Sequence, residues 1–574
     1  MVLIVLKELN GEMDKKVLDE WNKWRNAELV DEDLMVELDN IKSSEEEISD
    51  RFYRNLEFGT GGLRGVIGAG TNRMNVYTVA KATQGYSNYL KKQASSPSVA
   101  IAYDSRIKSD VFAKTAAEVF AANGIRVYIY PELMPTPSLS FAVRYLKCSG
   151  GIVITASHNP SKYNGYKVYG NDGCQITTEA ASSILGEIEA LDIFRDVNKL
   201  PFQEALAQGR IVYIGEDVVK EYLSAVSSQV LCGNDIDKDF SIVYTPLNGS
   251  GLKCVTRALR ENGFTNISVV KEQENPDGRF PTCPYPNPEM KEALELGLRD
   301  AKQLGSDLLL ATDPDCDRVG IAVRNNEDYV LLSGNEVGML LLDYICKRRI
   351  ALGKMPENPV LIKTIVTIDM AKRIAEDYGV KVIDVLTGFK FIGEQIGLLE
   401  AAGEEERFIL GFEESYGYLT GGYVRDKDAV DGSLMICEMF AYYKSQGISL
   451  IDVLNELYQK YGYCLNTLHS YTFEGAEGFQ KMQMIMRGLR ENALKNIGKK
   501  NVIEVKDYLA GIDRLPKSDV LKYLLEGNTS IVIRPSGTEP KLKVYLSVSA
   551  KNHEDAEMSE VSMVKDLEVL FGRS

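Results

Sequence analysis

Short runs of apolar residues recur along the chain and predict buried strands. Such runs occupy residues 99–103, 126–130, 151–154, 241–244, 307–312, 360–362 and 382–386. Apolar runs of this length that are bounded by polar residues are typical of strands buried inside a sheet. Segments with helical character lie between them, as the layers of a parallel α/β fold require. The pattern therefore predicts an α/β protein.

The alternation of strand and helix occurs in three blocks, and a different pattern follows the helical segment 450–457. Short predicted strands at residues 530–533 and 542–546 are combined with helices there, which indicates a smaller α+β domain. The three blocks look like related α/β units, although no residue-level repeat is strong enough to prove a duplication. At about 150 residues per domain, a chain of 574 residues holds about four domains. The predicted domains are residues 1–212, 213–326, 327–462 and 463–574.

The N-terminal part of the chain differs from the strand blocks that follow it. Residues 11–56 show charged, apolar-periodic patterns that predict helices, and residues 59–65 form a glycine cluster. We expect this cluster to be a loop that lets a ligand approach the backbone closely. The apolar residues 1–6 meet Lys7 and Glu8 at once, so they are too short for a signal-peptide core or a membrane span.

Composition narrows the class of protein. The chain is 44% hydrophobic and 26% charged, as in ordinary soluble globular proteins. Its formal charge of −16 argues against general affinity for nucleic acid or for an anionic membrane. The nine cysteines are scattered and form no Cys-x-x-Cys pair, which predicts reduced thiols and a cytoplasmic location. The sequence carries no signal for the oligomeric state.

Three aspartates follow the apolar run 307–312 at alternate positions. Asp313, Asp315 and Asp317 stand directly after this predicted strand, at the end where open α/β sheets bind ligands. Carboxylates packed so closely repel one another unless a cation neutralises them, and Mg²⁺ prefers such oxygen ligands. The alternative for an isolated Asp-x-Asp-x-Asp string is a solvated acidic turn.

A second polar string, residues 155–160, follows the predicted strand 151–154 and contains Ser157. A serine at this place can act as a nucleophile or phosphate carrier, although a helix cap or turn hydroxyl is the structural alternative. The chain has three histidines and no Gly-x-Ser-x-Gly elbow. Both facts argue against a Ser-His-Asp hydrolase.

Together with residues 411–418 and 534–540, these two strings resemble the α-D-phosphohexomutase superfamily. The length of the chain and its predicted N-terminal helices look most like the phosphoglucomutase/phosphopentomutase branch of that superfamily. The four motifs stand in the order of that family and span residues 155–540. The resemblance implies four domains, three α/β and one α+β, around a central active-site cleft. It also implies a sugar-binding loop at 411–418 and a phosphate-binding loop at 534–540.

The resemblance assigns a role to the serine and to the aspartates. Ser157 is implied to be the residue that carries the phosphoryl group. Asp313, Asp315 and Asp317 are implied to bind Mg²⁺ together with an oxygen on phosphorylated Ser157, which makes the serine a fourth member of the metal site.

Three further residues are implied to act in catalysis. Lys167 matches the general acid/base of the family, and a lysine that is buried or close to other cations can have the lowered pKa which suits that role. His158 and Arg64 are implied to contribute to the electrostatics of the site. The sequence leaves open which of the three transfers the proton.

The remaining implied residues bind the substrate. A sugar phosphate is expected to contact Arg318, Thr387, Gly388, Lys390, Glu413, Ser415 and Lys427. Its non-reacting phosphate is expected to be bound by Arg534, Ser536, Gly537 and Thr538, because an arginine fork and turn amides suit that anion.

The preferred interpretation is a Mg²⁺-dependent phosphoglucomutase that interconverts glucose 1-phosphate and glucose 6-phosphate, with glucose 1,6-bisphosphate as intermediate and activator. Phosphopentomutase, phosphomannomutase and glucose-1,6-bisphosphate synthase are alternatives, although Tyr416-Gly417 departs from the Gly-His pair common in phosphomannomutases. From other classes, a metal-dependent sugar phosphatase and a non-catalytic sugar-phosphate sensor are weighed as well. No Walker-type motif points to ATP as the phosphoryl donor.

Overall fold

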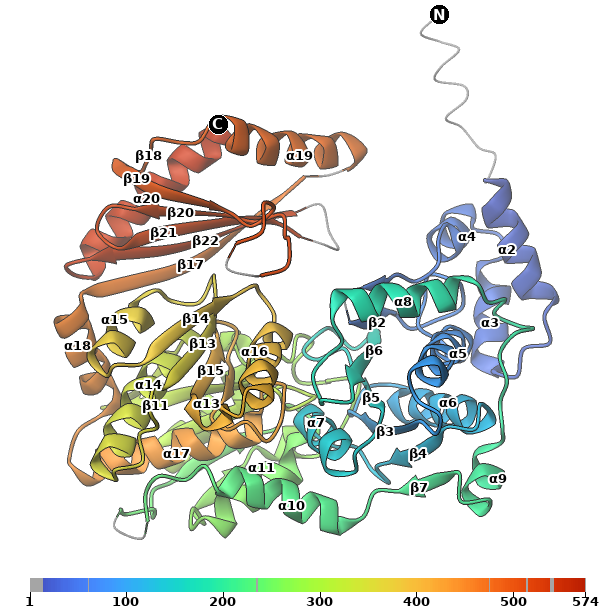
Figure 1. The fold of residues 1–574 in the computed structure, drawn as a ribbon, viewed down its shortest axis with the longest axis horizontal. Coiled ribbons are helices and arrows are strands. Elements are labelled where there is room, and N and C mark those ends of the chain that lie inside the picture. Colours follow the sequence, from blue (N-terminus) through green and yellow to red (C-terminus); the bar gives the residue numbers. More distant parts are fainter. Residues whose placement is uncertain are drawn as a thin grey trace, which may run out of the picture. The chain divides into compact units, whose positions relative to one another are not determined.

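The structure is a computed structural model that describes residues 14–59, 61–233, 236–473, 475–512, 515–536 and 541–572. The chain divides into two compact units, and Figure 1 shows that both combine helices with sheets. Unit 1 comprises Met1–Ser228, Ser241–Val319 and Tyr423–Ser433, and unit 2 comprises Gln229–Phe240, Gly320–Gly422 and Leu434–Ser574. Within the described ranges, every helix is too short or too polar to span a membrane.

The first sheet of unit 1 has seven strands. Their spatial order is β1 (Phe58–Gly59), β2 (Gly62–Val66), β6 (Tyr163–Gly170), β5 (Gly150–Ile154), β3 (Ser98–Tyr103), β4 (Arg126–Ile129) and β7 (Ile211–Tyr213). The strands from β5 to β7 pair in parallel, whereas β1, β2 and β6 pair antiparallel. The predicted strands in this block are confirmed, and their apolar side chains enter one buried core.

Five helices accompany this sheet. They are α5 (Val76–Gln93), α6 (Ser109–Ala122), α7 (Thr136–Tyr145), α8 (Thr178–Glu189) and α9 (Phe202–Ala207). The first of them begins with a capping box, in which the Asn75 side chain accepts from Thr78 N and the Thr78 hydroxyl accepts from Asn75 N. Helices and parallel strands thus alternate along the chain, as expected for an α/β layer.

The glycine cluster is not the loop that the sequence suggested. Gly62–Val66 form strand β2, which pairs antiparallel with β6 and sets Gly62 opposite Lys167. Gly62 has a φ of 141°, and a Cβ on it would lie 1.8 Å from the carbonyl oxygen of Tyr166. The glycine therefore serves a close approach between two strands.

From residue 14 onwards, where the description of the chain begins, three helices precede the sheet, as predicted for this segment. They are α2 (Lys15–Asn26), α3 (Glu32–Ile41) and α4 (Glu45–Phe52), and the side chains of Asp14, Asp31 and Ser44 cap their N-termini. Trp21 and Trp24 are buried and pack edge-on against Phe52. Their apolar faces join the core of the first sheet.

Unit 1 also contains a group of three parallel strands. Strand β8 (Ile242–Thr245) lies between β9 (Ile267–Val269) and β10 (Leu308–Thr312). The accompanying helices are α10 (Glu216–Ser227), α11 (Gly251–Glu261), α12 (Lys271–Glu274) and α13 (Lys291–Leu304). Every residue of β8 and β10 is buried, in agreement with their continuous apolar sequences.

Unit 2 repeats the strand order of the first block. Its four-stranded sheet runs β14 (Lys381–Val385), β13 (Val360–Thr364), β15 (Phe408–Glu413) and β16 (Gly417–Leu419). The first three strands pair in parallel and β16 is antiparallel, like β4-β3-β5-β6 of unit 1. The predicted similarity of these two α/β blocks is therefore seen in their strand topology, although their sequences show no clear residue-level repeat.

The elements around this sheet complete the block. A hairpin of β11 (Val319–Asn325) and β12 (Asp328–Leu332) precedes it in the chain but belongs to a different sheet. The helices are α14 (Gly334–Ala351), α15 (Met370–Asp377), α16 (Phe389–Ala401), the 3₁₀ turn η1 (Glu405–Arg407), α17 (Ala429–Ser445) and α18 (Leu450–Tyr461). Helix α17 begins in unit 1 and continues into unit 2.

The C-terminal part of unit 2 is an antiparallel sheet with two helices. Its strands run β17 (Tyr463–Thr472), β22 (Lys541–Ala550), β21 (Thr529–Pro535), β20 (Leu521–Leu525), β19 (Lys500–Asp507) and β18 (Asn496–Ile497). Helices α19 (Gly475–Glu491) and α20 (His553–Leu570) contribute apolar residues to its core. The predicted α+β domain is confirmed, while the domain boundaries at 212, 326 and 462 stay predictions.

Candidate active site

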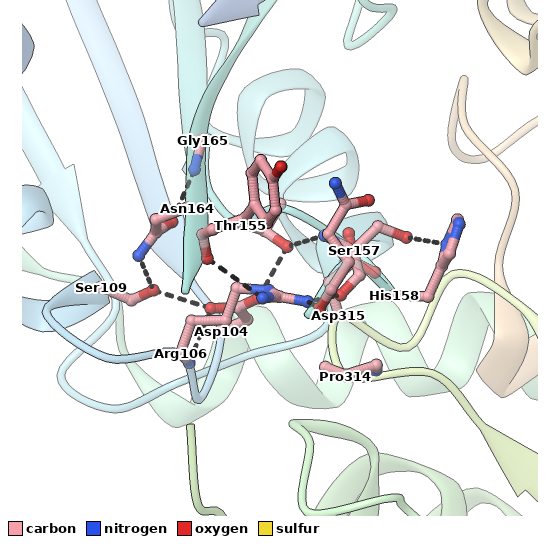
Figure 2. A network of polar contacts seen from close by, with 12 residues as sticks. Asp104, Arg106, Ser109, Thr155, Ser157, His158, Asn164, Gly165, Pro314 and Asp315 are labelled. Carbon is pink, nitrogen blue, oxygen red and sulfur yellow. Dashed lines mark hydrogen bonds and ion pairs between the residues drawn. The ribbon is translucent and has the colours of Figure 1, made fainter. Parts of the chain in front are cut away.

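Ser157 lies three residues beyond the end of β5, in a strained turn of unit 1. Its φ of +51° is in the left-handed region, and its side chain is almost fully buried. The backbone N–H of Ser157 donates to Thr155 Oγ1 at 2.8 Å, and the Thr155 hydroxyl donates to Asp104 Oδ2 at 2.7 Å (Figure 2). Two hydrogen bonds thus connect the serine backbone to a carboxylate that directly follows strand β3.

Asp104 and Arg106 support the serine turn from beneath (Figure 2). The Arg106 guanidinium is buried, lies 3.3 Å from Asp104 Oδ2 and faces the ring of Phe280 at 5.1 Å. It donates to four carbonyl oxygens of the turn and its continuation, those of Ser157, Asn159, Pro160 and Tyr163. Sequence reasoning assigned no role to these two residues. The usable signal was their place after β3, which pairs in parallel with β5.

The three aspartates stand in a tight turn after β10, with their side chains buried. One carboxylate oxygen from each lies within 4.8 Å of the others. The Ser157 hydroxyl donates to Asp313 Oδ2 at 2.8 Å. The other oxygen of Asp313 accepts the backbone amides of Asp317 and Arg318, both at 3.0 Å. The serine and the acidic turn, predicted from separate motifs, are therefore in direct contact.

Two lysines face the aspartates. Lys167 Nζ on β6 lies 2.9 Å from Asp315 Oδ2 and 3.3 Å from Asp317 Oδ2, and Lys427 Nζ lies 3.0 Å from Asp317 Oδ2. We call these three aspartates and two lysines the acidic cluster. Burial would lower the pKa of Lys167, but Asp315 and Asp317 outweigh it and raise that pKa. The expected lowering of this pKa is therefore wrong for the structure as it stands.

The acidic cluster has the properties of a cation site. Asp315 Oδ1 and Asp317 Oδ1 are buried, and neither has a hydrogen-bond partner among the residues that the structure describes. Burial and the two neighbouring carboxylates raise the pKa of Asp313 well above its ordinary value, because three charges so close are unfavourable in a dry environment. Hard carboxylate oxygens with free lone pairs suit Mg²⁺. The residues present thus fit a divalent cation.

A segment of unit 1 around Lys427 holds this lysine against the aspartates. Asp426 Oδ2 accepts a hydrogen bond of 2.7 Å from the Tyr169 hydroxyl. Asp428 accepts from the hydroxyls of Tyr222 and Tyr423 at 2.8 to 2.9 Å, and burial raises its pKa to about 6. Sequence reasoning singled out Lys427 in this segment but not the buried carboxylates beside it.

Three more residues that sequence reasoning assigned to the site are in unit 1: His158 contacts the serine, and Arg64 and Arg318 interact electrostatically with His158. His158 Nδ1 lies 3.1 Å from Ser157 Oγ, and burial together with Arg318 and Arg64 lowers the pKa of His158 well below 6.5. Its imidazole is thus neutral at neutral pH. Burial also lowers the pKa of Arg64, against the pull of Asp315. Arg318 forms an ion pair with Glu289 at 2.6 Å.

The expected sugar-binding residues belong to unit 2. Glu413 is buried at the end of β15, and Ser415 follows it in the turn before β16. Thr387 and Gly388 precede α16, where Gly388 has a φ of 115°, and Lys390 is in the first turn of that helix.

The expected phosphate-binding residues are on β21 and in the segment after it. Arg534 Nη1 donates to Thr387 Oγ1, so the structure brings two of the predicted residues together. Ser536 follows β21 directly. Gly537 and Thr538 lie outside the described residues.

Comparison with protein-family models gives four matches in chain order. They are Phosphoglucomutase/phosphomannomutase, alpha/beta/alpha domain I (residues 55–193), domain II (220–326) and domain III (333–461), and the C-terminal domain of the same family (490–561). The matches together include the serine turn, the acidic turn, the segment 411–418 and the segment 534–540.

Curated proteins and solved structures agree with these matches. A phosphoglucomutase of Staphylococcus haemolyticus is 37% identical over 515 residues, which cover 88% of this chain and 92% of that protein. A putative phosphomannomutase of Thermus thermophilus is similar in fold, with a TM-score of 0.67 at 22% identity, over 90% of this chain and 99% of the other. An N-acetylphosphoglucosamine mutase of Aspergillus fumigatus, solved with GlcNAc-6P and magnesium, has a TM-score of 0.51 at 14% identity, over 90% and 96%.

Proposed function

This chain belongs to the phosphoglucomutase/phosphomannomutase family, and we propose that it interconverts glucose 1-phosphate and glucose 6-phosphate. As a phosphoglucomutase-type mutase it is an enzyme of the isomerase class that moves a phosphoryl group within one sugar. The observation that carries the proposal is the contact of the Ser157 hydroxyl with the acidic cluster, at 2.8 Å from Asp313.

The proposed reaction has two half-reactions on Ser157. In the first, the bond between phosphorus and Ser157 Oγ breaks while a sugar hydroxyl bonds to phosphorus, which yields glucose 1,6-bisphosphate. In the second, the bisphosphate has turned end for end, and its other phosphoryl group returns to Ser157. The left-handed turn and the Arg106 hydrogen bonds hold the serine in one orientation, so positioning contributes to both steps.

A proton must leave the sugar hydroxyl in the first half-reaction and return in the second. We assign this transfer to the group formed by Lys167, His158 and Arg64. His158 is neutral and adjacent to Ser157 Oγ, whereas Lys167 is held by Asp315 and Asp317. Individual variants of the three, assayed over a range of pH, identify the residue whose loss changes the pH profile.

Asp313, Asp315 and Asp317 would hold Mg²⁺, with phosphorylated Ser157 supplying a fourth ligand. The unpartnered oxygens of Asp315 and Asp317 support this assignment, as does the magnesium in the solved Aspergillus mutase. When bound, the cation neutralises the negative charge that develops on the transferred phosphoryl group. Asp313 also accepts the serine hydroxyl, so it orients the carrier as well.

We assign the binding of the sugar phosphate to the substrate residues that the sequence singled out. The Glu413 carboxylate would accept hydrogen bonds from sugar hydroxyls, and the Ser415 hydroxyl would donate hydrogen bonds to them. Thr387, Gly388 and Lys390 would contact the edge of the sugar. Arg534, Ser536, Gly537 and Thr538 would bind the phosphate that does not react, and Arg318 and Lys427 would supply further positive charge. The carboxylate of Glu413 suits hydroxyl donors, while the Arg534 fork suits a phosphate.

Substrate competition tests this proposal. Turnover of glucose 1-phosphate, ribose 1-phosphate and mannose 1-phosphate is measured with a trace of the matching bisphosphate. We expect glucose 1-phosphate to have the highest kcat/KM, and a tenfold preference for ribose or mannose phosphate would instead identify a phosphopentomutase or phosphomannomutase. Net release of inorganic phosphate would identify a phosphatase, and binding without turnover would identify a sensor.

A further inference from the structure

A second, largely buried ionic group lies in unit 2 and includes none of the residues assigned above. Lys363, Lys372 and Lys522 surround Asp369 and Asp384, and we call these five residues the lysine cluster. Four of them belong to the α/β block of unit 2, on β13, at or near α15, and on β14. Lys522 alone comes from β20 of the C-terminal sheet.

Lys522 is inserted from the C-terminal sheet into the α/β block. Its side chain is 2% exposed, and its ammonium group donates to Ile365 O at 2.9 Å and lies 2.9 Å from Asp369 Oδ2. Burial lowers the pKa of Lys522 to about 8, because a desolvated ammonium is costly, while Asp369 opposes that shift. Such an ammonium is retained in the folded protein only where its partners are well aligned.

One face of β21 contacts the α/β block of unit 2 through three residues. Ser530 Oγ donates to Asp369 Oδ2 at 2.6 Å, Val532 packs in an apolar cluster with Ile365 and Leu386, and Arg534 Nη1 donates to Thr387. Alternate residues of a strand point to the same side, so positions 530, 532 and 534 share this face. Lys522 is opposite Val532 in the register of β20 and β21. Arg534 is thus the last of three successive attachments to the α/β block.

We propose that Lys522 and Ser530 are positioning residues: by binding Asp369 they fix β21, and thereby Arg534, for the phosphate of the sugar substrate. This inference rests on the proposed function, since it takes Arg534 to be the phosphate ligand. The polar contacts of Lys522 and Ser530 are with other residues of the protein, so these two residues would act on the substrate only through the strand that carries Arg534. The α/β block supplies Thr387, and the C-terminal sheet supplies Arg534, so the distance between the two depends on this junction.

A double-mutant cycle tests the proposal. We expect Lys522→Met to raise the KM for glucose 1-phosphate about 10- to 100-fold, since displacement of a ligand by about 1 Å has effects of this size. Phosphorylation of Ser157 by glucose 1,6-bisphosphate, followed by intact mass, should be unchanged. In an Arg534→Ala background, Lys522→Met should change KM by less than about twofold, because the residue through which it acts is already absent.

Ser530→Ala provides a milder variant in case Lys522→Met does not fold. It removes one hydrogen bond, leaves no charge unpaired, and is expected to raise KM about threefold, again only when Arg534 is present. Lys551→Met is the matched control, because Lys551 is exposed after β22, and its kinetics should equal those of the wild type.

Two outcomes overturn the proposal. The first is wild-type KM in both Lys522→Met and Ser530→Ala. The second is a Lys522→Met or Ser530→Ala effect that multiplies fully with that of Arg534→Ala, which would show independent action. The Kd for glucose 1-phosphate is also measured by calorimetry for the wild type and for each variant of the cycle. If the wild type binds this sugar phosphate but does not turn it over, the mutase assignment is wrong. The Kd values still test whether Lys522 and Ser530 position Arg534, because they do not depend on turnover.

Discussion

The acidic cluster of unit 1 and the lysine cluster of unit 2 both contain five charged side chains and both have a buried centre, although Lys372 at the edge of the lysine cluster is 41% exposed. Their charges are compensated in different ways. In the acidic cluster, three carboxylates face two lysines, and Asp315 Oδ1 and Asp317 Oδ1 make no hydrogen bond within the described part of the chain. In the lysine cluster, three lysines face two carboxylates. Asp384 Oδ1 makes no hydrogen bond to a described residue either, but it lies 3.0 Å from Lys363 Nζ, and backbone carbonyls accept from Lys363 and Lys522. The acidic cluster thus has an excess of negatively charged acceptors, whereas the lysine cluster has an excess of donors, which are bound by carboxylates and carbonyls.

This difference separates a site from a structural junction. A buried carboxylate oxygen without a donor is costly, and a folded protein retains it where a ligand completes it. A buried ammonium that is shared between a carboxylate and carbonyls needs no ligand. The sign of the excess charge of a cluster thus says more about function than does the number of ion pairs.

The largest expected effect is the loss of the phosphoryl carrier. Ser157→Ala removes the hydroxyl that contacts the acidic cluster, and mutase activity should fall about 10⁴-fold or more. Incubation with glucose 1,6-bisphosphate should add one phosphate to the wild type, as measured by intact mass, and none to the variant. A phosphorylated Ser157→Ala protein would contradict the assignment of the carrier.

A matched pair of variants distinguishes the two clusters by their need for metal. Asp315→Asn should lower kcat about 100-fold and abolish the rise in Tm that Mg²⁺ produces in the wild type. Asp369→Asn should keep the Mg²⁺-dependent rise but start from a lower Tm, because removal of one partner from a buried ion pair costs about 3–5 kcal/mol. The comparison breaks down if Asp369→Asn loses the response to Mg²⁺ or if chelator leaves the wild type fully active.

Arg534→Ala tests whether the strand fixed by the lysine cluster carries the phosphate ligand. The loss of a charge-assisted hydrogen-bonded pair costs about 2–4 kcal/mol, which is about 30- to 1,000-fold in kcat/KM for glucose 1-phosphate. Phosphorylation of Ser157 at high bisphosphate should survive, since the acidic cluster is intact. A kcat/KM within threefold of the wild type would remove Arg534 from the site.

The smallest effect concerns Asp428, a buried carboxylate with tyrosine hydroxyls as partners. Its pKa is raised from 3.8 in an unfolded chain to about 6, so protonated Asp428 favours folding and this stabilisation is lost as pH rises through about 6. The full effect corresponds to about 3 kcal/mol. The Tm of Asp428→Asn relative to the wild type should therefore increase between pH 4 and pH 6.5 in thermal melts. A constant difference over this range would contradict the raised pKa.

Much of the fold was predictable because a fully buried strand has a run of consecutive apolar residues, which is visible in the sequence. The apolar sequences of β8 and β10 predicted fully buried strands, and both are. The prediction of a loop at the glycine cluster was wrong. Gly62 is required by the carbonyl oxygen of Tyr166, which is about a hundred positions away in the chain and in another strand. A local pattern carries no record of such a neighbour.

The sequence by itself determined the chemical types at the site, because Ser157, Asp313, Asp315 and Asp317 stand directly after predicted strands and match the motifs of a family. Which groups they meet was decided by tertiary structure. Ser157 and Asp313 are 156 residues apart in sequence, and the Tyr169–Asp426 hydrogen bond joins residues 257 apart.

The same limit applies to the supporting residues. Arg106, beneath the serine, and Lys522, in the lysine cluster, look like ordinary charged residues in the sequence, where a solvated side chain is the usual expectation. Only folding buries them, and a buried cation must find carboxylates and carbonyls that the chain brings from distant strands. The physical reason is that burial and charge compensation depend on which strands become neighbours, and that choice belongs to the packed structure as a whole.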